Sequence, residues 1–172
     1  CHVTASALSR CGAFFLARNG WYAVAGLGLL ASYANHFYLM TQVETRGTVS
    51  EFVVGMTVLS VYFLTFALAE LMSPEDVRRR RLPFWFRNGF VTANSVCLLL
   101  LGTAQMTAYD FTRDVPEMFY YSLAAVLLVF CLAYLRLRAG DPLYNTYFVK
   151  GISAATLGLA FQFDAHTLTL SL

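Results

Sequence analysis

The sequence contains few charged residues. Only 13% of its 172 residues are Asp, Glu, Lys or Arg, whereas a typical soluble domain is about a quarter charged. The mean hydropathy is +0.58. These values exclude a water-soluble globular domain and a disordered chain. The net charge of +2 is too small for a surface that binds a nucleic-acid backbone, so no nucleic-acid partner is expected.

The sequence also lacks the common motifs of metal and nucleotide chemistry. Its four cysteines have no C-x-x-C spacing and two lie in apolar runs, so we expect neither a zinc site nor a disulfide. There is no glycine-rich phosphate loop and no H-E-x-x-H motif. Of the three histidines in the chain, only His36 lies clearly within a membrane-length apolar stretch, so paired haem ligation is excluded as well. We therefore predict no catalytic residue, no metal and no cofactor apart from bound lipids.

Five apolar stretches approach the roughly 20 residues that a helix needs to cross a bilayer. They are 20–40, 51–72, 89–109, 117–136 and 144–163. All four prolines fall between these stretches, where a missing N–H group is tolerated. The sequence thus predicts an all-α, polytopic membrane helical bundle of about five transmembrane helices over 20–172. Residues 1–19 are predicted to form an N-terminal segment facing the inside.

Three helix-start signals support these boundaries. Thr48-x-x-Glu51 is typical of a capping box at the start of the second span. Asp141-Pro142 predicts a capped start for the fifth span, with proline at the first helical position. Ser73-Pro74 likewise predicts a short basic helix over 74–82 that lies on the membrane surface.

The basic residues are distributed unequally between the two sides of the predicted bundle. Ten of the twelve fall on the side of the N-terminus, and only Arg46 and Arg113 fall on the other. Because cytoplasmic loops carry the excess of Lys and Arg, the N-terminus is expected inside and the C-terminus outside. Four consecutive arginines, Arg78, Arg79, Arg80 and Arg81, either contact anionic lipid heads or a partner, or serve only to set this topology.

Polar residues gather in the outer half of the predicted bundle. The members of this group are Asn35, His36, Glu51, Gln105, Gln162, Asp164 and His166. Ionisable groups at membrane depth are candidates for function, so this set is predicted to bind an ion, a proton or a polar head group. The alternative is structural: Glu51 caps a helix, Asn35 joins helices, and Asp164 and His166 lie in water.

Small residues recur at helical spacing in two of the predicted spans. In membranes, such stripes allow close packing of helices, so they are predicted to be packing positions. They are Gly28 and Ser32 in the first span and Gly151, Ala155 and Gly158 in the fifth. The single lysine, Lys150, lies in the same fifth span and either extends to the inner surface or is a desolvated, reactive amine.

Three functions are compatible with these features. The first is a non-catalytic accessory subunit of a larger, energy-transducing membrane complex. The second is a small oligomeric transporter or channel for an ion or small polar solute, with its polar site in the outer half of the membrane. The third is an intramembrane enzyme acting on a lipid or quinone head group. The expected partners are the lipid bilayer and other membrane subunits or copies of the chain, in an organellar or bacterial inner membrane.

Overall fold

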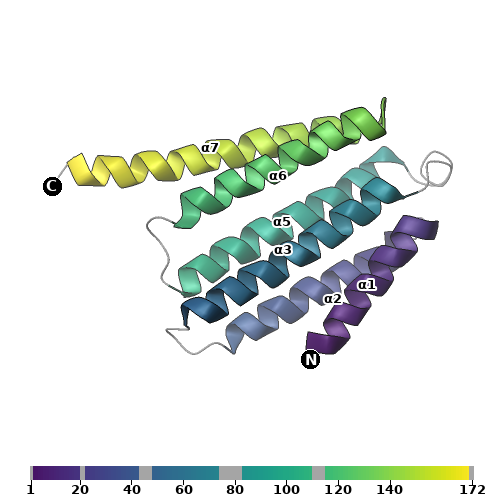
Figure 1. Ribbon diagram of the computed structural model, residues 1–172, viewed down its shortest axis with the longest axis horizontal. Coiled ribbons are helices and arrows are strands. Elements are labelled where there is room, and N and C mark those ends of the chain that lie inside the picture. Colours follow the sequence, from purple (N-terminus) through teal and green to yellow (C-terminus); the bar gives the residue numbers. More distant parts are fainter. Residues whose placement is uncertain (1, 20–21, 43–47, 74–82, 110–114, 171–172) are drawn as a thin grey trace. The chain divides into compact units, whose positions relative to one another are not determined.

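The computed structural model describes residues 2–19, 22–42, 48–73, 83–109 and 115–170. Within these ranges, the side chains of residues 2–9, 19 and 164–170 are left undescribed. The described part of the chain is all-α (Figure 1). Its six helices are α1 (His2–Asn19), α2 (Tyr22–Thr41), α3 (Val49–Met72), α5 (Phe84–Ala108), α6 (Val115–Leu137) and α7 (Leu143–Leu170).

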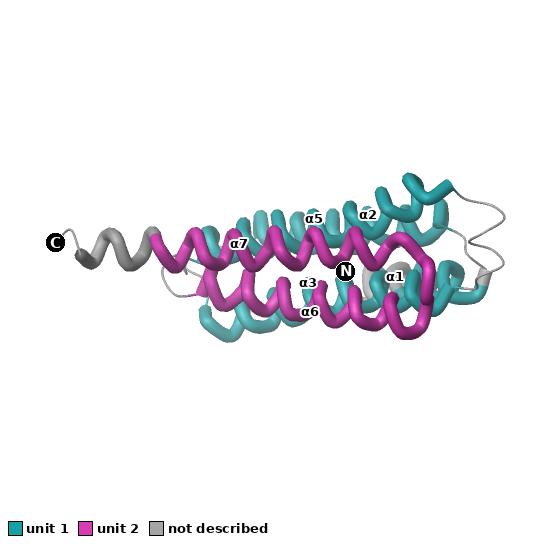
Figure 2. Tube along the Cα trace, turned by 90° about the horizontal axis from the view of Figure 1, so that it is seen from above, with its two compact units in different colours: residues 1–109 teal, residues 110–172 magenta. Residues whose placement is uncertain are grey.

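The helices form two compact units, residues 1–109 and residues 110–172 (Figure 2). In the first unit, α2 and α3 pack against each other, and both contact α1 and α5. In the second unit, α6 and α7 form an antiparallel hairpin. The single bundle expected over 20–172 stays a prediction.

Three helices are long and apolar enough to cross a membrane: α3, α5 and α6. The other two predicted spans coincide with α2 and α7, which in the described part of the chain are not among these candidates. Two helices extend beyond the predicted spans. Helix α5 begins at Phe84 rather than at 89, directly after Pro83, and α7 continues to Leu170 rather than ending at 163. Polar Arg87 and Asn88 interrupt the apolar pattern, so the apolar run by itself begins only at Gly89.

Local sequence sets two of the helix starts as predicted. The capping box at α3 is confirmed: Glu51 N donates to Thr48 Oγ1 at 3.4 Å, and Thr48 N donates to Glu51 Oε2 at 2.8 Å. Ahead of α7, the carboxylate of Asp141 accepts a hydrogen bond from Leu143 N at 3.2 Å. These bonds satisfy N–H groups that have no partner within the helix. The predicted surface helix over 74–82 lies outside the described residues.

Helix α1 was not anticipated as part of the helical packing. Gly12 lies close to α2, since a Cβ at this position would be 3.5 Å from the Cα atoms of both Ala25 and Gly28. Leu16 is fully buried, whereas Arg10 and Arg18 are exposed. Helix α1 is therefore amphipathic: its small and apolar side packs against α2 and α3, and its arginines face outward.

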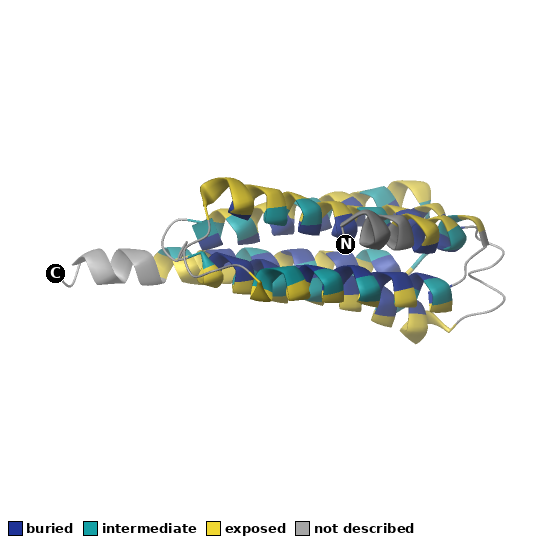
Figure 3. Ribbon diagram, turned by 90° about the horizontal axis from the view of Figure 1, so that it is seen from below, coloured by how far each residue is buried: buried dark blue, intermediate teal, exposed yellow. Residues whose placement is uncertain are grey.

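The outward faces of both units are apolar. Figure 3 shows buried residues on the inner sides of the helices and exposed residues along the outer sides. Large apolar side chains are among the most exposed, for example Leu27 at 67%, Leu100 at 59% and Val129 at 63%. Because an apolar patch of this extent is unusual on a soluble monomer, these faces are suited to lipid or to another membrane protein.

Candidate functional site

Three predicted site residues meet at one end of the first unit. His36 comes from α2, Glu51 from the start of α3 and Gln105 from the end of α5. His36 and Gln105 are buried, with only 4% and 1% of their surfaces exposed. The imidazole Nε2 of His36 lies 3.0 Å from Gln105 Oε1, and Gln105 Nε2 donates to the carbonyl of Phe52 at 3.0 Å.

These two bonds assign the proton on His36. The Phe52 carbonyl can only accept, so it orients the amide nitrogen of Gln105 toward itself. The amide oxygen is then directed at the imidazole, and Nε2 of His36 must be the nitrogen that carries the hydrogen. The side chains of His36 and Gln105 thereby join α2, α5 and the backbone of α3.

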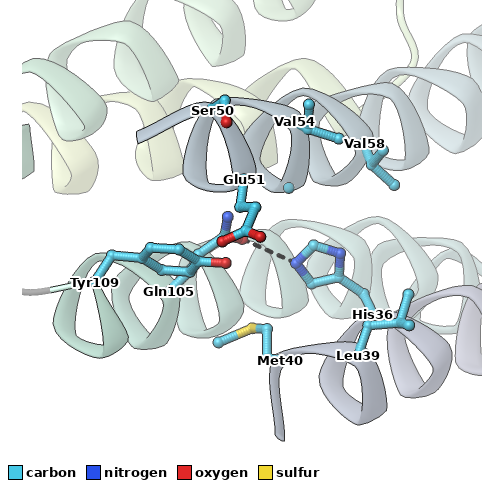
Figure 4. Close-up of a pocket in the computed structure, with 10 residues that line it drawn as sticks. His36, Leu39, Met40, Ser50, Glu51, Val54, Val58, Gln105 and Tyr109 are labelled. Carbon is cyan, nitrogen blue, oxygen red and sulfur yellow. Dashed lines mark hydrogen bonds between the residues drawn. The ribbon is translucent and has the colours of Figure 1, made fainter. Parts of the chain in front are cut away.

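A pocket of about 260 Å³ opens beside this pair (Figure 4). Its walls are mainly apolar, and Leu39, Met40, Val54 and Val58 line it. The polar groups collect in one part of it, where Figure 4 shows the exposed carboxylate of Glu51 and the hydroxyl of Tyr109 directed into the same space. A mostly apolar pocket with a few convergent polar groups is the usual form of a small-molecule site.

The remaining predicted members of the polar group lie elsewhere. Asn35 is half-buried, and its Nδ2 has no hydrogen-bond partner among the described residues. Gln162 belongs to the second unit, where its Oε1 accepts a hydrogen bond from Tyr121 at 2.8 Å. The side chains of Asp164 and His166 lie outside the described residues. The structure thus brings together His36, Glu51 and Gln105 from this set.

A buried ion pair at the opposite end of the first unit was missed by the sequence reasoning. Glu70 is completely buried, and its Oε1 accepts from Tyr22 at 2.8 Å and from Arg87 Nη2 and Nε at 2.9 and 3.1 Å. Its Oε2 has no hydrogen-bond partner in the described part of the chain. The available signal was an acidic residue inside an apolar span, because such a residue is normally paired.

A third polar contact lies between the Gln105 contact and the Glu70 ion pair. On each of α2, α3 and α5, its residue falls between the residues of the other two contacts. Tyr33 donates to Asn94 Oδ1 at 2.7 Å, and Asn94 Nδ2 donates to the carbonyl of Phe63 at 3.0 Å. We call the three contacts the Glu70, Asn94 and Gln105 layers. Their members are Tyr22, Glu70 and Arg87; Tyr33, Phe63 and Asn94; and His36, Phe52 and Gln105. Every layer takes one residue from each of α2, α3 and α5.

The predicted packing positions lie at or near helix contacts. A Cβ on Gly151 would be 3.0 Å from Leu128, and one on Gly158 would be 3.1 Å from Tyr121, so both glycines are close to α6. Ala155 between them is half-buried. On α2, Gly28 lies next to Gly12 of α1, as described above, and its carbonyl accepts from Ser32 at 2.7 Å.

Two other predicted features have limited structural support. The arginines Arg78, Arg79, Arg80 and Arg81 lie outside the described residues. Lys150 is half-buried, and its ammonium group lies 5.8 Å from the centre of the Tyr147 ring, within the range of a cation–π contact.

Within the described ranges, no group of three or more His, Cys, Asp or Glu side chains could hold a metal ion. Cys11, Cys97 and Cys131 are free thiols. Comparison with protein-family models, curated proteins and solved structures finds no match to this chain.

Proposed function

We propose that this chain is a non-catalytic accessory subunit of a larger membrane complex, of the kind that transduces energy. The observation that carries the proposal is that its buried polar side chains are engaged in contacts between helices. In the three polar layers, these groups bond to one another and hold α2, α3 and α5 together. The outward faces are apolar. The buried polar groups thus hold the helices of the first unit together, and the apolar outer surface is left for lipids and neighbouring subunits.

The proposed topology has five spans, α2, α3, α5, α6 and α7, with the N-terminus inside. Helix α1, which carries Arg10 and Arg18, then packs along α2, with Gly12 beside Ala25 and Gly28. The Glu70 layer lies toward the inner surface and the Gln105 layer toward the outer one. The excess of arginine near the inner helix ends supports this orientation. An organellar or bacterial inner membrane is the proposed location, with bound lipids and other subunits or copies of the chain as partners.

Purification in mild detergent tests the subunit proposal. A tagged chain expressed in its own cells should migrate on native gels as a large particle with a reproducible set of other membrane proteins. An unrelated multi-span protein of similar size, carrying the same tag, is the control and should not recover that set. A chain that migrates alone, or only with copies of itself, would overturn the proposal.

A small transporter or channel is the second candidate. The pocket beside His36, Glu51 and Gln105 favours it, because these residues come from three helices and surround one space. A conducting pathway would also have to pass the Asn94 and Glu70 layers, whose groups are engaged with one another, and this favours the first candidate. Flux measured in liposomes separates the two. Transport by the purified chain that is lost in His36→Asn and Gln105→Leu, with the helical content retained, would support the transporter.

A further inference from the structure

We infer that the pocket beside the Gln105 layer binds the head group of a phospholipid that carries an ammonium ion. The pocket has a polar part and an apolar part, as an amphiphile requires. Glu51 is the charged residue of its lining, and the apolar side chains of Val54 and Val58 follow it along α3. A cationic head at Glu51 would place an acyl chain against these valines and against Leu39 and Met40 of α2.

The Glu51 carboxylate favours an ammonium head over a neutral, carbonyl-bearing ring such as a quinone. In the buried pair beside it, His36 Nε2 donates to Gln105, and Gln105 Nε2 donates to the Phe52 carbonyl. The charged group that faces the pocket is an acceptor, the Glu51 carboxylate. Its capping bond to Thr48 N uses Oε2, and a carboxylate has several further lone pairs. An ammonium group supplies three donors and a positive charge.

The aromatic ring of Tyr109 adds a second element of recognition. Tyr109 lines the pocket together with Glu51. Figure 4 shows its hydroxyl beside the carboxylate. A cation near such a ring is attracted to its face, and the hydroxyl can donate to the phosphate that follows an ammonium head in a phospholipid. Glu51 is exposed at the start of α3, where a head group reaches it without crossing the apolar core.

The inference does not depend on the subunit proposal, because it concerns binding to the purified chain alone. The test is native mass spectrometry of the delipidated full chain in detergent, titrated with a short-chain phosphatidylethanolamine. Phosphatidylglycerol of the same chain length, which has no ammonium group, is the control lipid. We expect the ethanolamine lipid to bind at least tenfold more tightly than the glycerol lipid.

Two variants locate the binding. Glu51→Gln removes the charge but retains a capping-box side chain, so the helical content should be unchanged. It should weaken phosphatidylethanolamine binding roughly tenfold to a hundredfold, the effect of losing one charge-assisted hydrogen bond. Glu117→Gln, which neutralises the first turn of α6, is the matched control and should bind like wild type. Val58→Phe, which fills the apolar part, should abolish binding of the lipid while leaving the fold intact.

Three results would overturn the inference. One is equal binding of the two lipids by the wild-type chain. Another is an unchanged affinity in Glu51→Gln while helical content and thermal midpoint match those of wild type. The third is free ethanolamine competing as strongly as the lipid, since this would assign the pocket to a small solute and leave the apolar wall without a role.

Discussion

Removal of Arg87 should destabilise the first unit strongly. Glu70 is fully buried, and Arg87 supplies two of the three hydrogen bonds that its Oε1 accepts. Arg87→Met retains much of the apolar stem but leaves the carboxylate with only the Tyr22 hydroxyl among its described partners. Breaking a buried pair by removing one member costs about 3–5 kcal/mol, because the remaining charge has no compensation.

The partner substitutions set the expected pattern. Tyr22→Phe deletes one bond to a charged acceptor and should cost about 1.5–3 kcal/mol. The double variant Glu70→Gln/Arg87→Met removes both charges, so its loss should be smaller than the sum of the two single losses by about 0.5–3 kcal/mol. Arg10→Met, at an exposed position of the same unit, is the control and should remain within about 0.5 kcal/mol of wild type.

Reversible unfolding of the purified chain in mixed micelles, followed by circular dichroism, measures these free energies. Arg87→Met within 1 kcal/mol of wild type would refute the reasoning. So would strict additivity of the Glu70 and Arg87 substitutions, because it would mean that the two charges do not interact.

Three further changes test the other contacts, two by the same unfolding measurement and one by cysteine labelling. Gly55→Ala should cost about 1–3 kcal/mol, because its Cβ would overlap the amide of Gln105. Gly89→Ala is the control and should be neutral or stabilising, because its Cβ meets no atom within 4 Å. Equal effects of the two substitutions would contradict the close packing of Gly55 against Gln105. Asn94→Leu should cost about 1–3 kcal/mol, because it removes the side-chain hydrogen bonds to Tyr33 and to the Phe63 carbonyl, and a stabilised variant would disprove that. Gly158→Leu should loosen the α6–α7 hairpin and raise cysteine labelling of Cys131, and unchanged labelling would count against close packing there.

Much of the helical architecture could be predicted from the sequence. The apolar runs identify α3, α5 and α6, because a membrane-spanning helix must be apolar along nearly its whole length. The capping box at Thr48 and the carboxylate at Asp141 mark helix starts through local hydrogen bonds. Both signals depend only on neighbouring residues, so no tertiary information is needed to interpret them.

The pairing of polar groups was only partly predictable. Counting along spans of alternating direction places His36 and Gln105 at the same level, and the structure brings them into hydrogen-bond contact. Which helix faces which depends on packing, so the same counting grouped Gln162 with them although it bonds to Tyr121 in the second unit. Arg87 was interpreted only as a topology signal, because nothing local in the sequence indicates that its side chain turns toward Glu70.

Helix α1 was the largest omission. Its two arginines and low mean hydropathy favour an exposed segment. Neither property indicates that one narrow side of the helix packs against other helices. Gly12 and Leu16 lie four residues apart and therefore on one side of the helix, but such a short signal is weak until a partner helix is known. The small residues Ala25 and Gly28 on α2 provide that partner.

The most direct test of the membrane arrangement is the accessibility of the two ends of α3. Ser50→Cys and Met72→Cys, both at exposed positions, are introduced separately into a chain whose native cysteines are replaced by alanine. Each is treated in sealed, right-side-out vesicles with a membrane-impermeant maleimide. If the N-terminus of the chain is inside, α3 crosses the bilayer from the outside to the inside. Ser50→Cys should then be labelled in sealed vesicles, and Met72→Cys only after the vesicles are opened. Labelling of both positions in sealed vesicles would contradict the membrane-spanning assignment of α3.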